Sequence, residues 1–107
     1  LGEKMVAFNA QQFVIIADWE KQSKRIGTNY KKGIPLTIMP QSVSYMGHCV
    51  VETLKAKIKN LSERKIECPL RLAQQKAGPV ITDDGHMIFD IQFDAPIECE
   101  DVDRMNK

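Results

Sequence analysis

Net charge, cysteine and long apolar runs are all scarce in this chain of 107 residues. The 15 Lys and Arg residues against 14 Asp and Glu leave a formal net charge of +1, so no strongly basic or acidic field is present. No apolar run approaches the ~20 residues of a membrane span, and the N-terminus lacks the basic and then apolar pattern of a secretory signal. We therefore expect no nucleic-acid partner and no membrane association.

Cysteine and histidine give no sign of a disulfide framework or a metal site. The 3 Cys residues are widely spaced, and an odd, sparse set fits reduced thiols of the cytoplasm. His48 and Cys49 are adjacent, so on a helix they point in different directions and cannot converge on a metal. With 43% hydrophobic and 27% charged residues, the composition is that of an ordinary globular domain. We expect a cytoplasmic protein without a bound metal.

Residues 1–33 have the pattern of an α/β fold. Apolar side chains recur at helical spacing through residues 1–12, which predicts an amphipathic helix. The continuous apolar run over residues 13–17 is typical of a parallel strand buried on both faces. The stretch from Lys21 to Gly33 is polar and interrupted by glycine, which indicates a linker. A helix that leads directly into a buried strand is half of a βαβ unit.

Residues 34–107 have the pattern of an α+β unit. From Ser42, a plausible helix N-cap, apolar residues recur at spacings of three and four as far as Ile58, which predicts a helix. Alternating apolar residues predict strands over 66–72 and 87–93, the first at a sheet edge because it contains Pro69. The other predicted elements are a strand over 34–39, a short strand over 79–81, a turn at Asp84-Gly85 and a helix over 98–107. The order β-α-β-β-α is that of an α+β sandwich without its final strand.

Two charged side chains lie where α/β proteins place functional groups. Lys21 follows the predicted buried strand, and ligands of open α/β sheets bind outside the carboxyl ends of the strands. A lysine there can meet a phosphate or an enolate-like oxygen, or it can be an ordinary surface residue. Glu3 lies in the first turn of the first predicted helix, where an acid suits the helix dipole without any catalytic role. The residue types alone leave both alternatives open.

Several longer motifs in the chain are more specific than any single residue. They are Glu3-Lys4-Met5-Val6-Ala7, Phe13-Val14-Ile15-Ile16-Ala17-Asp18 followed by Lys21, Ser23-Lys24-Arg25-Ile26-Gly27, Lys32-Gly33-Ile34-Pro35, Arg71-Leu72-Ala73, Lys76-Ala77-Gly78-Pro79-Val80-Ile81-Thr82-Asp83-Asp84-Gly85 and Met87-Ile88-Phe89-Asp90. In order and spacing they resemble the middle and distal part of the type A ribose-5-phosphate isomerase family. The resemblance covers nearly the whole chain and is closest over residues 1–40 and 71–93.

The resemblance implies an enzyme that interconverts ribose 5-phosphate and ribulose 5-phosphate in the pentose phosphate pathway. The family moves a proton between adjacent sugar carbons through a cis-enediolate, and by motif match its carboxylate base falls on Glu3. The family's substrate-binding lysine falls on Lys21. No metal or organic cofactor is implied. Because the family's smaller domain contributes to subunit contacts, the resemblance also implies a homo-oligomer for the full-length enzyme.

The resemblance further implies a domain organisation. Residues 1–33 correspond to the terminal part of a Rossmann-like catalytic domain plus a linker, and residues 34–107 to a ferredoxin-like α+β small domain lacking its last strand. The family's phosphate loop and aspartate motifs lie upstream of the matched part, so we expect little or no isomerase activity from this chain alone. The alternative is that residues 34–107 form a stand-alone α+β module for binding or oligomerisation, without catalysis.

Overall fold

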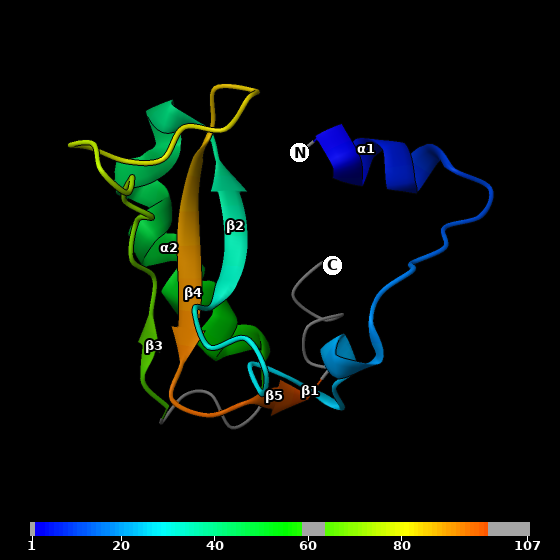
Figure 1. The fold of residues 1–107 in the computed structure, drawn as a ribbon. Coiled ribbons are helices and arrows are strands. Elements are labelled where there is room, and N and C mark those ends of the chain that lie inside the picture. Colours follow the sequence, from blue (N-terminus) through cyan, green and yellow to red (C-terminus); the bar gives the residue numbers. More distant parts are fainter. Residues whose placement is uncertain (1, 59–63, 99–107) are drawn as a thin grey trace.

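The structure is a computed structural model that describes residues 2–58 and 64–98 (Figure 1). We refer to residues 2–18 as the arm and to residues 34–93 as the body. In chain order the elements are α1 (Gly2–Asn9), the 3-10 turn η1 (Trp19–Lys21), β1 (Arg25–Ile26), β2 (Ile34–Ile38), the 3-10 turn η2 (Pro40–Ser42), α2 (Val43–Lys57), β3 (Ile66–Glu67), β4 (Met87–Phe93) and β5 (Ile97–Glu98).

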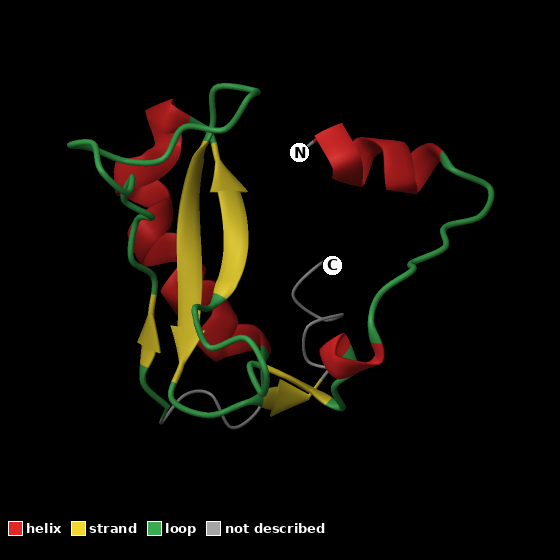
Figure 2. Cartoon of the chain, viewed as in Figure 1, coloured by secondary structure: helices red, strands yellow, loops and turns green. Residues whose placement is uncertain are grey.

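The body is a three-stranded antiparallel sheet with α2 beside it (Figure 2). The strand order is β2-β4-β3, so the long strand β4 lies in the centre. β4 pairs with β2 from Ile34↔Ile91 to Ile38↔Met87, and with β3 at Ile66↔Phe93. The strands predicted over 34–39 and 87–93 and the helix predicted after Ser42 are therefore confirmed.

The hydrophobic core lies between α2 and the sheet. Its buried members are Val50, Leu54, Ile58, Ile66 and Ile91. Residues 50, 54 and 58 recur every fourth position, so they share one helix face and its continuation. Ile58 is the most buried of them, with 2% of its surface exposed. Burial of each such side chain contributes about 1.5–3 kcal/mol, which makes this cluster the main source of stability for the body.

The strand predicted over 66–72 forms only in part. β3 ends at Glu67, and isolated bridges continue the pairing along β4 and the adjoining loop. The bridges are Leu70↔Phe89 and Leu72↔Pro79. Pro69 interrupts the ladder because it has no backbone N–H to donate. The short strand predicted over 79–81 is likewise reduced to the single bridge at Pro79.

Two predicted local features, a turn and a helix N-cap, lie at their predicted positions. The N–H of Gly85 donates to the Thr82 carbonyl at 2.8 Å, and Gly85 has a φ of +75°, which closes the predicted Asp84-Gly85 turn. Ser42 lies at the N-cap of α2, but its side chain makes no capping bond there. Its hydroxyl donates instead to the Met39 carbonyl at 3.0 Å, because Ser42 also ends η2.

The arm contains one confirmed prediction and one wrong one. The helix predicted over 1–12 is present as α1, although none of its residues is buried. The buried strand predicted over 13–17 is wrong for this structure, because these residues form no strand and Ile16 is 95% exposed. A strand needs a hydrogen-bonding partner, and no strand in the described part of the chain pairs with this segment.

A second, two-stranded sheet joins the linker to the end of the body. β1 and β5 pair antiparallel, with Arg25 opposite Glu98 and Ile26 opposite Ile97. The sequence predicts a linker where β1 lies and a helix from Glu98 onward. The predicted helix start is wrong, because Glu98 belongs to strand β5. The pairing with Arg25 holds Glu98 in extended backbone. The rest of the predicted helix, residues 99–107, lies outside the described residues.

Candidate functional site

Lys21 is the last residue of the 3-10 turn η1, directly after the arm. The backbone closes this turn with two hydrogen bonds. The Lys21 N–H donates to the Asp18 carbonyl at 3.0 Å, and the Gln22 N–H donates to the Trp19 carbonyl at 3.0 Å. The side chain of Lys21 is exposed. Its ammonium group is therefore accessible to an anionic ligand.

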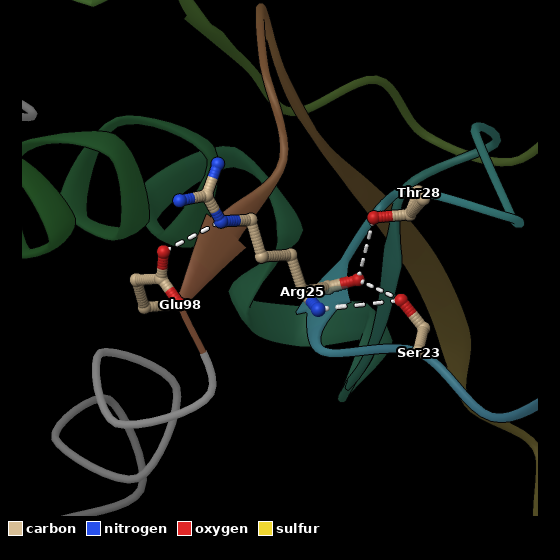
Figure 3. A network of polar contacts seen from close by, with 4 residues as sticks. All are labelled: Ser23, Arg25, Thr28 and Glu98. Carbon is tan, nitrogen blue, oxygen red and sulfur yellow. Dashed lines mark hydrogen bonds and ion pairs between the residues drawn. The ribbon is translucent and has the colours of Figure 1, made fainter.

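Three residues that follow Lys21 in the linker form a network of polar contacts with Glu98 of β5 (Figure 3). The hydroxyls of Ser23 and Thr28 both donate to the Arg25 carbonyl, the latter at 2.9 Å. The Arg25 Nε lies 2.6 Å from Oε1 of Glu98 across the β1–β5 pair. We call these four residues the Arg25 network. It fixes the conformation of residues 23–28 through contacts within the linker and with β5.

Asn29 connects the linker to the turn that carries Lys21. Its Nδ2 donates to the carbonyl of Glu20 at 2.8 Å, across nine positions of sequence. Glu20 is the middle residue of η1 and the neighbour of Lys21. The sequence gives no signal for this contact, because a lone Asn in a polar linker fits many conformations.

Glu3 lies in the first turn of α1 and is exposed. Negative charge is favourable there, because the helix N-terminus carries partial positive charge. The same turn approaches the body, since a Cβ built on Gly2 would lie 3.8 Å from Oδ2 of Asp84. Glu3 directly follows Gly2, the residue at which α1 approaches Asp84.

The structure does not bring Glu3 and Lys21 together within its described residues. α1 and η1 stand at opposite ends of the extended residues 10–18 of the arm (Figure 1). Glu3 lies in α1 and Lys21 in η1. Their convergence on one substrate is a prediction that the described residues do not test.

A cavity of about 570 Å³ lies elsewhere, between the linker and the end of β4. Its lining is mainly apolar and includes Ile26, Tyr30, Ile34 and Phe93, but neither Glu3 nor Lys21. Gly33 allows the linker to approach β4 closely, because a Cβ there would lie 2.7 Å from the Ile91 carbonyl oxygen. Gly33 also has a φ of +109°, a conformation that other residues rarely adopt. The cavity is thus a consequence of linker packing and is separate from both candidate site residues.

A charge pair with two hydrogen bonds joins Arg71 to Asp90 in the body. The guanidinium donates two hydrogen bonds to the carboxylate, from Nε at 2.9 Å to Oδ2 and from Nη2 to Oδ1. The hydrogen bond to Asp90 raises the pKa of Arg71 above its already high usual value. Burial, with a smaller effect of the Asp90 charge, raises the pKa of the nearby Cys68 thiol. Since Arg71 already pairs with Asp90 in this two-point geometry, we interpret it as a structural link between the loop before β4 and β4 itself.

The described residues contain neither a metal-binding cluster nor a membrane-spanning helix. Among residues 2–58 and 64–98, no group of three or more His, Cys, Asp or Glu side chains is placed to hold a metal ion. In the same ranges, no helix has the length and apolar character needed to cross a membrane.

Comparison with known proteins identifies the family. The model of the family described as "Ribose 5-phosphate isomerase A (phosphoriboisomerase A)" matches residues 1–107. The chain therefore belongs to the ribose 5-phosphate isomerase A family, and the resemblance seen in its motifs is confirmed.

Curated relatives from distant organisms carry the same name. The chain is 40% identical over 97 residues to the ribose-5-phosphate isomerase of Dictyostelium discoideum, covering 91% of this chain and 38% of the relative. It is 37% identical over 92 residues to that of Homo sapiens, covering 86% and 26%. It is 36% identical over 100 residues to ribose-5-phosphate isomerase A of Methanocaldococcus jannaschii, covering 92% and 38%. The chain thus spans well under half the length of these relatives. No solved structure matches the chain.

Proposed function

We propose that this chain forms part of an isomerase that interconverts D-ribose 5-phosphate and D-ribulose 5-phosphate. The observation that carries the proposal is the family match along residues 1–107, together with relatives that bear this name. The accessible positions of Glu3 and Lys21 are consistent with roles in binding and catalysis. We further propose that the enzyme acts in the cytoplasm, in the pentose phosphate pathway, as a homo-oligomer and without a cofactor.

In the proposed reaction Glu3 is the catalytic base. Its carboxylate removes the proton from the sugar carbon beside the carbonyl group, which leaves a cis-enediolate. The resulting carboxylic acid returns the proton to the neighbouring carbon, while the hydroxyl proton passes from the oxygen of the first carbon to the oxygen of its neighbour. These two transfers convert the aldose to the ketose. A positioned general base contributes typically 10²–10⁴-fold to rate. The exposed position of Glu3 supports this role, because it leaves the carboxylate accessible to a substrate.

Lys21 is proposed to bind the negatively charged substrate. The ammonium group can contact either the phosphate or an oxygen of the enediolate, both of which are anionic. The exposure of Lys21 and the short turn that presents it support this role.

We propose that residues 1–33 complete a Rossmann-like domain and that residues 34–107 form a ferredoxin-like small domain. The continuous apolar run of residues 13–16, which is exposed in this structure, supports the first assignment, because such runs are typical of strands in parallel sheets. The strand order β2-β4-β3 supports the second, because in a βαββαβ unit the third strand lies between the first two.

The test of the reaction uses the complete native protein that contains this sequence. Glu3→Gln keeps the size of the side chain but removes the base, so we expect kcat to fall by about 10²–10⁴-fold. The matched control is Glu52→Gln on the exposed surface of α2, which should leave kcat unchanged. The measurement is the formation of ribulose 5-phosphate, with NMR detection of solvent deuterium at the substrate carbon. Undiminished turnover and deuterium uptake in Glu3→Gln would refute the assignment.

A module for binding or oligomerisation is the second candidate. This module would consist of residues 34–107, and the observation in its favour is that the body has a hydrophobic core of its own between α2 and the sheet. Sedimentation of the 107-residue chain at two concentrations, with and without ribose 5-phosphate, separates the two readings. If the chain is such a module, its sedimentation coefficient rises with concentration and does not change when ribose 5-phosphate is added. A part of the isomerase, in the complete protein, shows Lys21 protected by substrate from chemical acylation.

A further inference from the structure

The hydrogen bond from Asn29 to the Glu20 carbonyl joins two parts of the chain that local structure does not connect. The donor lies in the linker after β1 and the acceptor lies inside η1, with 2.8 Å between Nδ2 and the oxygen. The carbonyl group of Glu20 belongs to the peptide unit that leads directly into Lys21. A contact at this atom therefore acts on the backbone that carries the lysine.

The turn that carries Lys21 has little stability of its own. It is a single 3-10 turn of three residues, and such turns have weaker hydrogen-bond geometry than an α-helix. Asp18 occupies its N-cap without a capping side-chain bond. Residues 10–18 of the arm, which precede the turn, are extended and exposed, so they give the turn no packed support. The direction in which Lys21 projects therefore depends on contacts made by the linker residues that follow the turn.

Asn29 is itself fixed by its neighbours in the linker. The preceding residue, Thr28, donates its hydroxyl to the Arg25 carbonyl at 2.9 Å. Arg25 pairs with Glu98 both in the β1–β5 ladder and through its side chain. The Arg25 network thus links β5 to Thr28 (Figure 3). The next residue, Asn29, continues the path through its hydrogen bond to the Glu20 carbonyl.

We propose that Asn29 is a positioning residue for Lys21 and so determines the affinity for the anionic sugar-phosphate substrate; this inference rests on the proposed function. A lysine held in place before the ligand arrives loses less conformational freedom on binding than one that must be ordered by the ligand. Asn29 acts through the Glu20 carbonyl and is not a catalytic residue. Its loss weakens substrate binding and leaves the chemical step intact.

The experiment compares Asn29→Asp with Gln92→Glu in the complete native protein. Both changes replace an amide by a carboxylate of equal size and remove a bond to a linker or turn carbonyl. Gln92 donates to the Lys32 carbonyl at 3.3 Å, away from η1. Loss of one neutral hydrogen bond corresponds to about 2- to 13-fold in an equilibrium constant. We expect KM for ribose 5-phosphate to rise by that factor in Asn29→Asp, with kcat within about twofold, and no change in Gln92→Glu.

Lys21→Ala and the double variant distinguish this inference from the proposed function. If Asn29 acts through Lys21, Asn29→Asp has no further effect on KM in the Lys21→Ala background. Equal effects in both backgrounds, or an unchanged KM in Asn29→Asp, overturn the role of Asn29 while Lys21 retains its own. If Lys21→Ala itself leaves KM unchanged, the proposed binding role of Lys21 fails first, and the inference fails with it.

Discussion

The burial of Ile58 makes a quantitative prediction about the stability of the body. Ile58→Ala removes side-chain carbons from the core cluster, where Ile58 is only 2% exposed. The lost transfer free energy is roughly 0.8 kcal/mol for each of three carbons, and the remaining cavity adds to it. We therefore expect the free energy of unfolding to fall by about 3 kcal/mol. With a urea slope of about 1–3 kcal/mol/M, the unfolding midpoint falls by about 1–3 M.

The matched control is Ile16→Ala, which makes the same chemical change in a side chain that is 95% exposed. In the 107-residue chain it should change the free energy of unfolding by less than about 0.5 kcal/mol. Urea titration followed by circular dichroism measures both variants. Equal losses in the two variants would refute the placement of the core between α2 and the sheet. In the complete native protein we expect Ile16→Ala to become costly, because the proposed Rossmann-like domain buries this segment.

Two further predictions concern backbone strain and pH. Gly33→Ala should destabilise the chain by about 1–3 kcal/mol more than Gly78→Ala, as measured by thermal unfolding. Both glycines have positive φ, but only at Gly33 does the added Cβ meet a backbone atom, the Ile91 carbonyl oxygen; equal losses would contradict the close approach. The raised pKa of Cys68 favours its neutral thiol in the folded state. This contribution to stability is complete below the unfolded thiol pKa of about 8.5 and is lost as pH rises toward the higher folded value. Cys68→Ala should therefore lose less stability than the unmodified chain between pH 7 and pH 10, about the range of the thiol titration, in urea titrations; identical losses would contradict it.

Strong periodicity allowed the central elements of the body to be predicted from the sequence. β2, α2 and β4 each carry an apolar pattern that matches one buried face, and such a pattern depends only on residues close in sequence. The run over residues 13–17 also had a clear pattern, but a strand is completed by its partner, and the described residues contain none for it. β1 and β5 were missed because strands of two residues have no periodicity to detect.

The candidate site shows the same limit. Glu3 and Lys21 could be located because each lies in a motif shared with a family, and the family is confirmed. The bond from Asn29 to the Glu20 carbonyl and the ion pair of Arg25 with Glu98 could not be predicted. Such contacts depend on how the linker folds back on itself, and polar residues in a linker are compatible with many such paths.

The pairing of β1 with β5 places the chain segments before and after the body side by side. A unit whose two ends are adjacent can be accommodated within a host domain as a nested insertion, because the host backbone does not have to stretch to reach across it. Residues 27–96 can then be regarded as one long insertion whose two ends lie next to each other. If a short turn replaced this insertion, β1 and β5 would remain at nearly the same distance from each other.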